Sequence, residues 1–155
     1  MKKSLADMKP VDENKAPEQK TFGAFKNIEG NQATIDLEVL REHNVFFATP
    51  CYGGQVTDQF FLSMFRMSQK FMQHGINFRI TTLRNESLIT RGRNILTAMF
   101  LESECSHLMF IDADIEFEAD DILRALAYDK PIMAAAYPKK ALPIQYAINF
   151  KFVDQ

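Results

Sequence analysis

Residues 107–114 read His-Leu-Met-Phe-Ile-Asp-Ala-Asp, and this stretch decides the class of fold that we expect. Its consecutive apolar residues, Leu108 to Ile111, predict a strand of a parallel sheet that is buried on both faces. Asp112 and Asp114 follow this apolar run directly. Because ligands of open α/β sheets bind at the carboxyl ends of the strands, two carboxylates at this position predict a divalent metal ion held by oxygen ligands.

The composition limits the classes of protein to which the chain can belong. With 155 residues, of which 46% are hydrophobic and 25% charged, it has the size and balance of one globular domain. The net charge of −2 creates no basic field for nucleic acid or an anionic membrane. Cys51 and Cys105 form neither a zinc motif nor a disulfide framework. No apolar stretch resembles a signal peptide or a membrane span. We therefore expect a cytoplasmic protein with no membrane span and no nucleic-acid partner.

The amino-terminal part differs in composition from the rest of the chain. Residues 1–30 are rich in Lys, Glu, Asp, Asn and Pro and have no periodicity, which is typical of a flexible leader. Residues 31–43 show only a weak alternation of apolar positions. We expect residues 1–43 to be a leader and a transitional segment, and residues 44–155 to form the folded domain.

From Asn44 onward, strand-like apolar runs alternate with helical patterns. The apolar runs predict strands at residues 45–49, 76–83, 108–111 and 131–137. The patterns between them predict helices at residues 58–74, 88–100 and 119–128. This order predicts an α/β fold of the Rossmann-like type, with a mostly parallel sheet, flanking helices and right-handed crossovers. Residues 144–153 alternate like a further strand, whose open edge would allow pairing into a homo-oligomer.

Each expected helix has an apolar side that should face the sheet. The first helix carries Phe60, Phe61, Met64, Phe65, Phe71 and Met72 on its expected core side. The second carries Leu88, Ile95, Leu96, Met99 and Phe100, and the third carries Ile122, Leu123 and Leu126. Thr57 or Asp58 is expected to cap the first helix, and Gly75 to end it.

The carboxyl ends of the first three expected strands carry the candidate binding residues. These are Thr49, Pro50 and Tyr52 after the first strand, Asn85 after the second, and Asp112 and Asp114 after the third. Since parallel strands end at the same edge of a sheet, these residues should lie where a nucleotide would bind. An aromatic ring can pack on a base, polar groups can contact a ribose, and carboxylates can hold a metal ion on phosphates.

A basic segment lies near the start of the second expected helix, where residues 91–94 read Arg-Gly-Arg-Asn. Guanidinium groups suit diphosphate oxygens because they donate hydrogen bonds in a fork. Plainer interpretations stay open. The two arginines could be exposed or pair with Glu86 and Glu102, and Asp114 could serve only as a turn residue or helix cap.

The order and spacing of these segments resemble those of a known family. Asp112-Ala-Asp114 after an apolar strand is similar to the D-x-D signature of nucleotide-sugar-dependent glycosyltransferases of the GT-A fold. Residues 85–94 resemble the segment that precedes this signature in family 2-like and Anp1-like members. Residues 49–52 look like their first-strand P-x-Y element. The resemblance covers about residues 44–140, the nucleotide-binding half of that fold.

The resemblance implies a role for each candidate residue. Asp114 would coordinate a Mn²⁺ or Mg²⁺ ion that bridges the diphosphate of the donor, a nucleoside-diphosphate sugar. Asp112 would bind the same metal indirectly, or the ribose. The nucleoside pocket would be lined by Thr49, Pro50 and Tyr52. The phosphates or the sugar of the donor would be held by Arg91, Arg93 and Asn94. These residues belong to the segment 85–94, which begins with the candidate residue Asn85.

Three functions are compatible with these features. The first is a metal-dependent glycosyltransferase that moves a sugar to an unknown glycan, lipid or protein acceptor. The second is a truncated or degenerate GT-A module that binds a nucleotide or a partner without catalysis. This alternative is motivated by the absence of an evident acceptor-binding half: no histidine follows the D-x-D, and Asp154 is the only carboxylate after Asp129. The third is a phosphatase of the haloacid-dehalogenase type, but that family has its D-x-D on the first strand, whereas here it follows the third.

Overall fold

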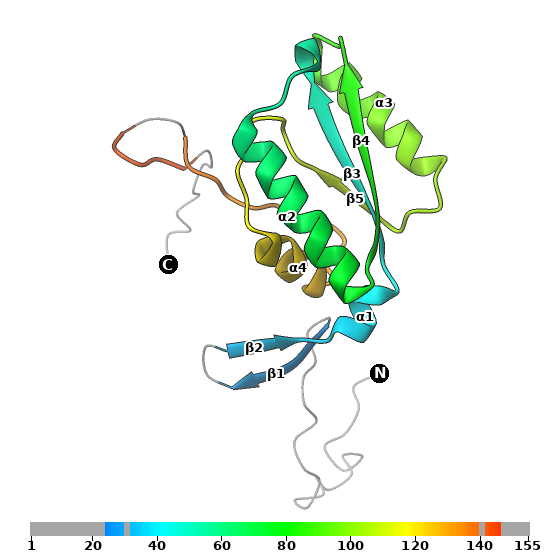
Figure 1. The fold of residues 1–155 in the computed structure, drawn as a ribbon, viewed down its shortest axis with the longest axis vertical. Coiled ribbons are helices and arrows are strands. Elements are labelled where there is room, and N and C mark those ends of the chain that lie inside the picture. Colours follow the sequence, from blue (N-terminus) through cyan, green and yellow to red (C-terminus); the bar gives the residue numbers. More distant parts are fainter. Residues whose placement is uncertain (1–23, 30–31, 140–141, 147–155) are drawn as a thin grey trace, which may run out of the picture.

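The computed structural model describes residues 24–29, 32–139 and 142–146 (Figure 1). Its centre is a parallel sheet with the strand order β4–β3–β5. The strands are β3 (Asn44–Cys51), β4 (Asn77–Arg84) and β5 (His107–Phe110). They alternate along the chain with α2 (Asp58–His74), α3 (Ile89–Leu101) and α4 (Ala119–Ala127). The predicted fold class, a Rossmann-like α/β fold with a parallel sheet and flanking helices, is confirmed.

Strand β3 is the buried centre of the sheet. Its residues Val45 to Thr49 are all 0% exposed, as expected for a parallel strand that is covered on both faces. Val45 and Phe47 belong to one core cluster, whereas Phe46 and Ala48 belong to another. Successive side chains of β3 therefore anchor the two layers of helices on opposite faces of the sheet.

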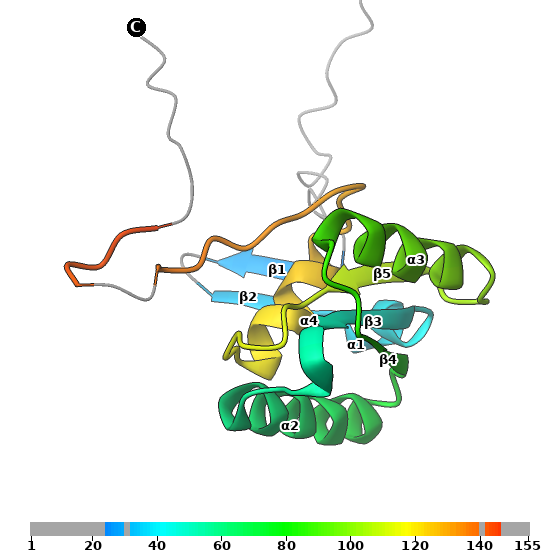
Figure 2. The same ribbon diagram turned by 90° about the horizontal axis from the view of Figure 1, so that it is seen from above.

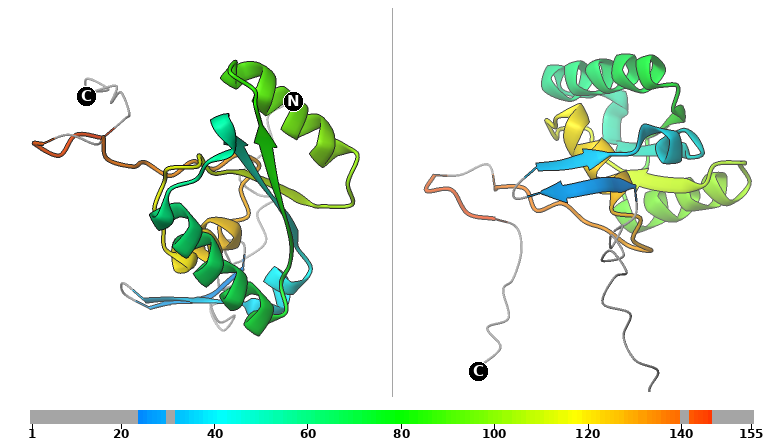
Figure 3. Two further views of the ribbon diagram at one scale, coloured as in Figure 1. Left: turned by 45° about the horizontal axis from the view of Figure 1, so that its top comes forward. Right: turned by 90° about the horizontal axis from the view of Figure 1, so that it is seen from below.

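The helices cover both faces of the sheet. Helices α2 and α4 contribute to the core cluster of Val45 and Phe47 on one face, and α3 packs with Leu96 against Phe46 on the other. Figure 2 and the right-hand view of Figure 3 show α2 and α3 on opposite sides of the strands. The crossover from β3 through α2 to β4 and the crossover from β4 through α3 to β5 run in opposite directions along the sheet, so two right-handed crossovers require this arrangement.

Helix α2 has the predicted ends but a different core side. The Thr57 hydroxyl accepts a hydrogen bond from the Phe60 amide at 3.3 Å, and Gly75 ends the helix with a left-handed φ of 70°. The buried positions follow one helical stripe, made of Phe60, Met64, Met67 and Phe71. The expectation that Phe61, Phe65 and Met72 would join them is wrong, since all three are exposed. Within the described residues, no helix is long and apolar enough to cross a membrane.

The buried sides of α3 and α4 were predicted with different success. In α3 the side chain of Leu96 is fully buried and Phe100 packs against its cluster. The expectation was wrong for three others, because Leu88, Ile95 and Met99 are exposed. In α4 the predicted core residues, Ile122, Leu123 and Leu126, are all buried.

The folded body begins before Asn44. Strands β1 (Phe25–Glu29) and β2 (Gln32–Ile35) form an antiparallel pair, and α1 (Leu37–Arg41) leads from it into β3. The Ala24 amide donates a hydrogen bond to the Ala127 carbonyl of α4 at 2.8 Å, and Leu40 is fully buried in the core. The expected flexible leader therefore does not extend through residues 24–29, while residues 1–23 lie outside the described residues.

The expected fourth strand at residues 131–137 is absent. This segment is exposed and leaves the body after α4 (Figures 1 and 2). The reason follows from the position of α4. Because α4 lies on the same face as α2, a right-handed connection through it would lead from β5 back toward β3 and not outward. Of the further strand expected at residues 144–153, residues 144–146 form only a bridge of Tyr146 with Pro138, and the rest lies outside the described residues.

A pair of histidines packs at the amino-terminal end of the sheet. The rings of His43 and His107 lie 4.2 Å apart between their centroids. Burial lowers the pKa of His107 below its ordinary value of 6.5, the neighbouring His43 lowers it further, and Asp129 opposes the shift. The unfolded chain therefore binds a proton at this site more readily than the folded chain does, and stability is lost as the pH falls below 6.5.

We predict that the Tm of the protein decreases by a few degrees between about pH 7.5 and about pH 5 in part because of His107. The variant His107→Gln should lose that part of the decrease, because glutamine does not titrate. His74→Gln, at the carboxyl-terminal end of α2, is the control for replacing a histidine away from this pair. Thermal unfolding followed by circular dichroism across this range measures both. An identical pH dependence in His107→Gln and the unmodified protein would contradict the assignment.

Candidate functional site

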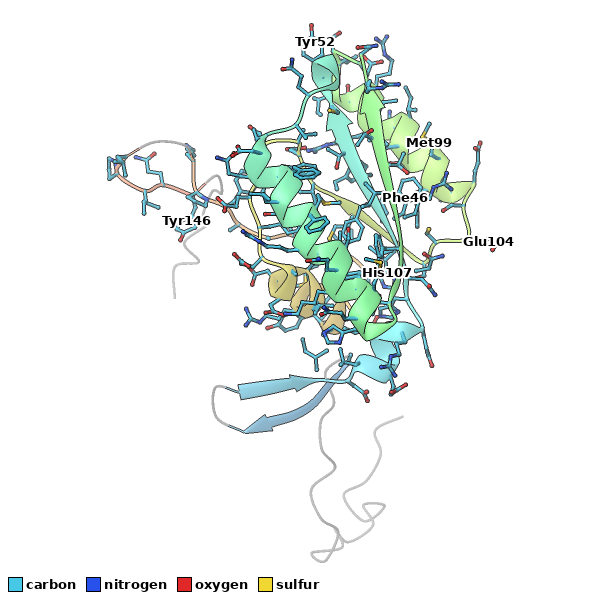
Figure 4. All side chains as sticks on the ribbon, in the orientation of Figure 1. Phe46, Tyr52, Met99, Glu104, His107 and Tyr146 are labelled. Atoms are coloured by element: carbon cyan, nitrogen blue, oxygen red, sulfur yellow. The ribbon has the colours of Figure 1, made fainter. Side chains whose placement is uncertain are left out.

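The carboxyl ends of β3, β4 and β5 share one edge of the sheet, as the sequence predicted. In the parallel register, Cys51 pairs with Arg84, and Ala48 pairs with Phe110. Strands β4 and β5 lie on opposite sides of β3, so the chain leaves β3 in one direction and β4 in the other. The point between the ends of β3 and β5 is therefore the topological switch point, where α/β proteins bind ligands. Figure 4 shows Tyr52 at this edge, far from His107 at the start of β5.

The loop that holds the two aspartates is attached to the start of α2. The Thr57 amide donates to the Ala113 carbonyl at 3.0 Å, and the Thr57 hydroxyl contacts the same oxygen at 3.5 Å. This hydroxyl is also the N-cap of α2. The backbone between Asp112 and Asp114 is thus held by the N-cap residue of a 17-residue helix, which fixes where the two carboxylates emerge.

Arg93 of α3 meets Asp112 across the end of β5. Its Nη2 donates to Oδ1 of Asp112 at 3.1 Å and lies 3.5 Å from Oδ2. Its guanidinium carbon also lies 5.5 Å from the centre of the Phe110 ring, at a distance at which the ring attracts a cation. The interpretation that Arg93 pairs with Glu102 is therefore wrong. The structure instead joins two predicted site residues that are 19 positions apart in the chain.

Arg91 is held by Glu86, as one of the plainer interpretations proposed. Its Nε and Nη2 donate to the two carboxylate oxygens of Glu86 at 2.6 and 2.8 Å. The Leu88 amide donates to the same carboxylate at 2.9 Å. The contact with Arg91 holds the pKa of Glu86 below its usual range, and the same contact raises the pKa of Arg91. Arg91 remains 62% exposed, whereas its partner Glu86 is only 14% exposed, so the pair presents the guanidinium and not the carboxylate to solvent.

The carboxyl end of β3 and the loop that follows it present one of their three candidate residues to solvent. Tyr52 is 75% exposed, Pro50 is half-buried and Thr49 is 0% exposed. The Thr49 hydroxyl has no hydrogen-bond partner in the described part of the chain. A buried hydroxyl without a partner costs about 1–3 kcal/mol. Tyr52 begins the short 3-10 turn η2 (Tyr52–Gly54), whose glycines adopt positive φ angles, and its exposed ring is accessible to a ligand at the edge.

The two asparagines of the candidate set are both exposed. Asn85 follows β4 directly and has a left-handed φ of 60°, which asparagine tolerates better than most residues. Asn94 lies beside Arg93 in the first turns of α3. Their amide groups are accessible to a ligand at the same edge, but within the part of the chain that the structure describes neither side chain forms a hydrogen bond that assigns it a role.

Asp112 and Asp114 are the two carboxylates that the sequence offers as metal ligands. Across residues 24–29, 32–139 and 142–146, no group of three or more His, Cys, Asp or Glu side chains gathers to hold a metal ion. Mg²⁺ is commonly held by one or two carboxylates, with substrate phosphates and water completing its oxygen ligands. The residues present therefore fit a metal ion that binds together with a phosphate ligand, and they do not fit a metal enclosed by protein ligands alone.

No family model, curated protein or solved structure matches this chain. A function must therefore be argued from the chemistry of the edge itself. The structure brings together Asp112, Arg93 and the loop at Thr57. It also joins Glu86 to Arg91, the pairing that the sequence left open. The signal for Glu86 was present, since a glutamate five residues before an arginine in the turn that opens a helix can orient it.

We predict that Thr57→Val lowers the free energy of unfolding by about 1 kcal/mol, because it removes the N-cap of α2. It should also loosen the aspartate loop, because the hydroxyl contact with Ala113 is lost. Thr97→Val is the control, since the Thr97 hydroxyl bonds only within α3, to the Arg93 carbonyl. Urea unfolding and amide hydrogen exchange at residues 112–115 measure the two effects. Equal changes in the two variants would contradict the role of Thr57.

Proposed function

We propose that this edge of the sheet binds a nucleoside-diphosphate sugar together with Mn²⁺ or Mg²⁺, and that the protein is a metal-dependent glycosyltransferase. The observation that carries the proposal is the meeting of Arg93 and Asp112 beside Asp114 at the topological switch point. Cationic groups there suit the oxygens of a diphosphate, and carboxylates suit the metal ion that accompanies it. The resemblance to GT-A glycosyltransferases in the order of these segments supports the same conclusion.

Different residues at the edge would bind different parts of the donor. Asp112 and Asp114 would hold the metal ion, and the guanidinium groups of Arg91 and Arg93 would hold phosphate oxygens. Tyr52, whose ring is exposed at the edge, would stack on the base. Pro50, Asn85 and Asn94 remain proposed contacts to the nucleoside, the phosphates or the sugar. Thr49 does not, because its side chain is 0% exposed inside β3 and a ligand at the edge does not reach it.

The chemistry of such a site is the departure of a diphosphate. In the transfer, the bond between the anomeric carbon and the phosphate oxygen breaks, a bond to an acceptor oxygen forms, and the nucleoside diphosphate leaves. A divalent metal ion, when bound, offsets the negative charge that develops on that leaving group. Arg91 and Arg93 contribute in the same way, because their charge is already in place before the reaction. The acceptor, which would be a glycan, a lipid or a protein, supplies the attacking hydroxyl group.

We predict that UDP or GDP raises the Tm by several degrees when Mn²⁺ is present and much less when it is absent. A ligand at 100 times its Kd stabilises a folded protein by about 2.7 kcal/mol. The variant Asp114→Ala should lose the metal-dependent part of this shift. Asp121→Ala is the control, because Asp121 pairs with Arg124 on α4 and not at the edge. The proposal fails if neither nucleotide shifts the Tm with Mn²⁺ present.

Transfer is separated from binding by an assay of turnover. The protein is incubated with Mn²⁺ and UDP- or GDP-sugars, and release of the nucleoside diphosphate is measured. Release that depends on Asp114 supports an enzyme. Binding of nucleotide without any release supports the non-catalytic module instead.

A further inference from the structure

Both oxygens of the Asp112 carboxylate face a cation that belongs to the protein. Arg93 lies 3.1 Å from Oδ1 and 3.5 Å from Oδ2. The guanidinium is held from a second side by the ring of Phe110, at 5.5 Å. Asp112 lies two positions after Phe110, the last residue of β5, and the carboxylate and the ring both contact the guanidinium of Arg93.

This contact has opposite effects on the two ligands proposed for the edge. A divalent cation that approaches Asp112 meets a carboxylate whose charge is already neutralised, and it also meets a second positive charge beside it. An anionic diphosphate that approaches the same point meets the guanidinium of Arg93, whose Nη2 donates to Asp112. When the diphosphate takes over the Nη2 donor, the Asp112 carboxylate no longer has the arginine beside it, and its oxygen atoms become accessible to the metal ion.

We propose that Arg93 couples the two ligands, so that the Asp112–Asp114 pair takes up a divalent cation together with a diphosphate and only weakly without one. The inference rests on the proposed function, because it assigns the order of binding at the same site. By linkage, a diphosphate that raises the affinity for the metal ion is itself bound more tightly, by the same factor, when the metal ion is present. The protein would thus avoid holding a metal ion at this edge when no donor is bound.

Arg91 supplies a matched comparison within the same helix. Both arginines lie in the first turns of α3, two positions apart, and both are partly exposed. Arg91, however, is bound to Glu86 and not to either aspartate of the loop. Removing Arg91 takes a positive charge from the edge and leaves Asp112 paired with Arg93. Removing Arg93 takes away a positive charge and also the partner of Asp112.

The first measurement is the affinity for Mn²⁺ alone, taken from the signal of free Mn²⁺ in electron paramagnetic resonance. We predict that Arg93→Gln binds Mn²⁺ about two- to fivefold more tightly than the unmodified protein, which is the effect expected of one partly exposed ion pair. Arg91→Gln should leave the affinity unchanged. Arg93→Met is a second variant that keeps an apolar stem on Phe110, and it should agree with Arg93→Gln.

The second measurement is the affinity for a diphosphate with Mg²⁺ in excess, taken by isothermal titration calorimetry with UDP, GDP and inorganic pyrophosphate. Here Arg93→Gln should bind about tenfold more weakly, because a charge-assisted hydrogen bond is lost. A merely structural role of Arg93 would weaken both ligands. The signature of coupling is therefore the opposite sign of the two changes, and weaker or unchanged Mn²⁺ binding in both Arg93 variants would overturn it.

The pyrophosphate arm separates this inference from the proposed function. If Arg93→Gln binds Mn²⁺ more tightly and pyrophosphate more weakly, but UDP and GDP do not bind, the coupling stands and the nucleotide-sugar function fails. If UDP or GDP binds with metal but Arg93→Gln does not tighten Mn²⁺ binding, the function stands and the coupling is overturned.

Discussion

Strand β3 is covered on both faces, and the positions of the other elements follow from it. Its alternate side chains, Phe46 on one side and Phe47 on the other, enter separate core clusters. Each cluster is completed by helices that pack on that face of the sheet. Because β4 and β5 then flank β3 as parallel neighbours, all three strands end at one edge. The burial of a few apolar residues in the middle of the sheet therefore determines where the polar segments meet.

The charged side chains at that edge form ion pairs of opposite sign and not a patch of one sign. Glu86 directs Arg91 toward solvent, and Arg93 covers Asp112. Partly exposed pairs of this kind contribute little to stability, so their value lies in position. One arginine is offered to a ligand, and the other is shared between a ligand and a carboxylate. The N-cap at Thr57 links this arrangement to the core, because it fixes the aspartate loop to the helix that packs on Phe47.

Sequence patterns predicted strands and helices well in segments whose residues are compatible with only one type of element or cap. The run at residues 45–49 and the caps of α2 are examples. The core side of α2 was harder, because neighbouring positions such as Phe60 and Phe61 are both apolar and a shift of one position rotates the buried side by about 100°. The apolar segment at residues 131–137 has the composition of a strand, but pairing needs a partner edge that the connection can reach. That condition depends on the face on which α4 packs.

For the site, the chain alone determined which residues could meet, because parallel strands must end at one edge and the polar segments follow those ends. Pairs close in the chain, such as Glu86 and Arg91, were also within reach of sequence reasoning. Only the tertiary structure decided that Arg93 reaches Asp112, that Thr49 is buried and that Tyr52 is exposed. The physical reason is that these outcomes depend on distances between elements, which packing of the helices on the sheet sets and which no local pattern of residues contains.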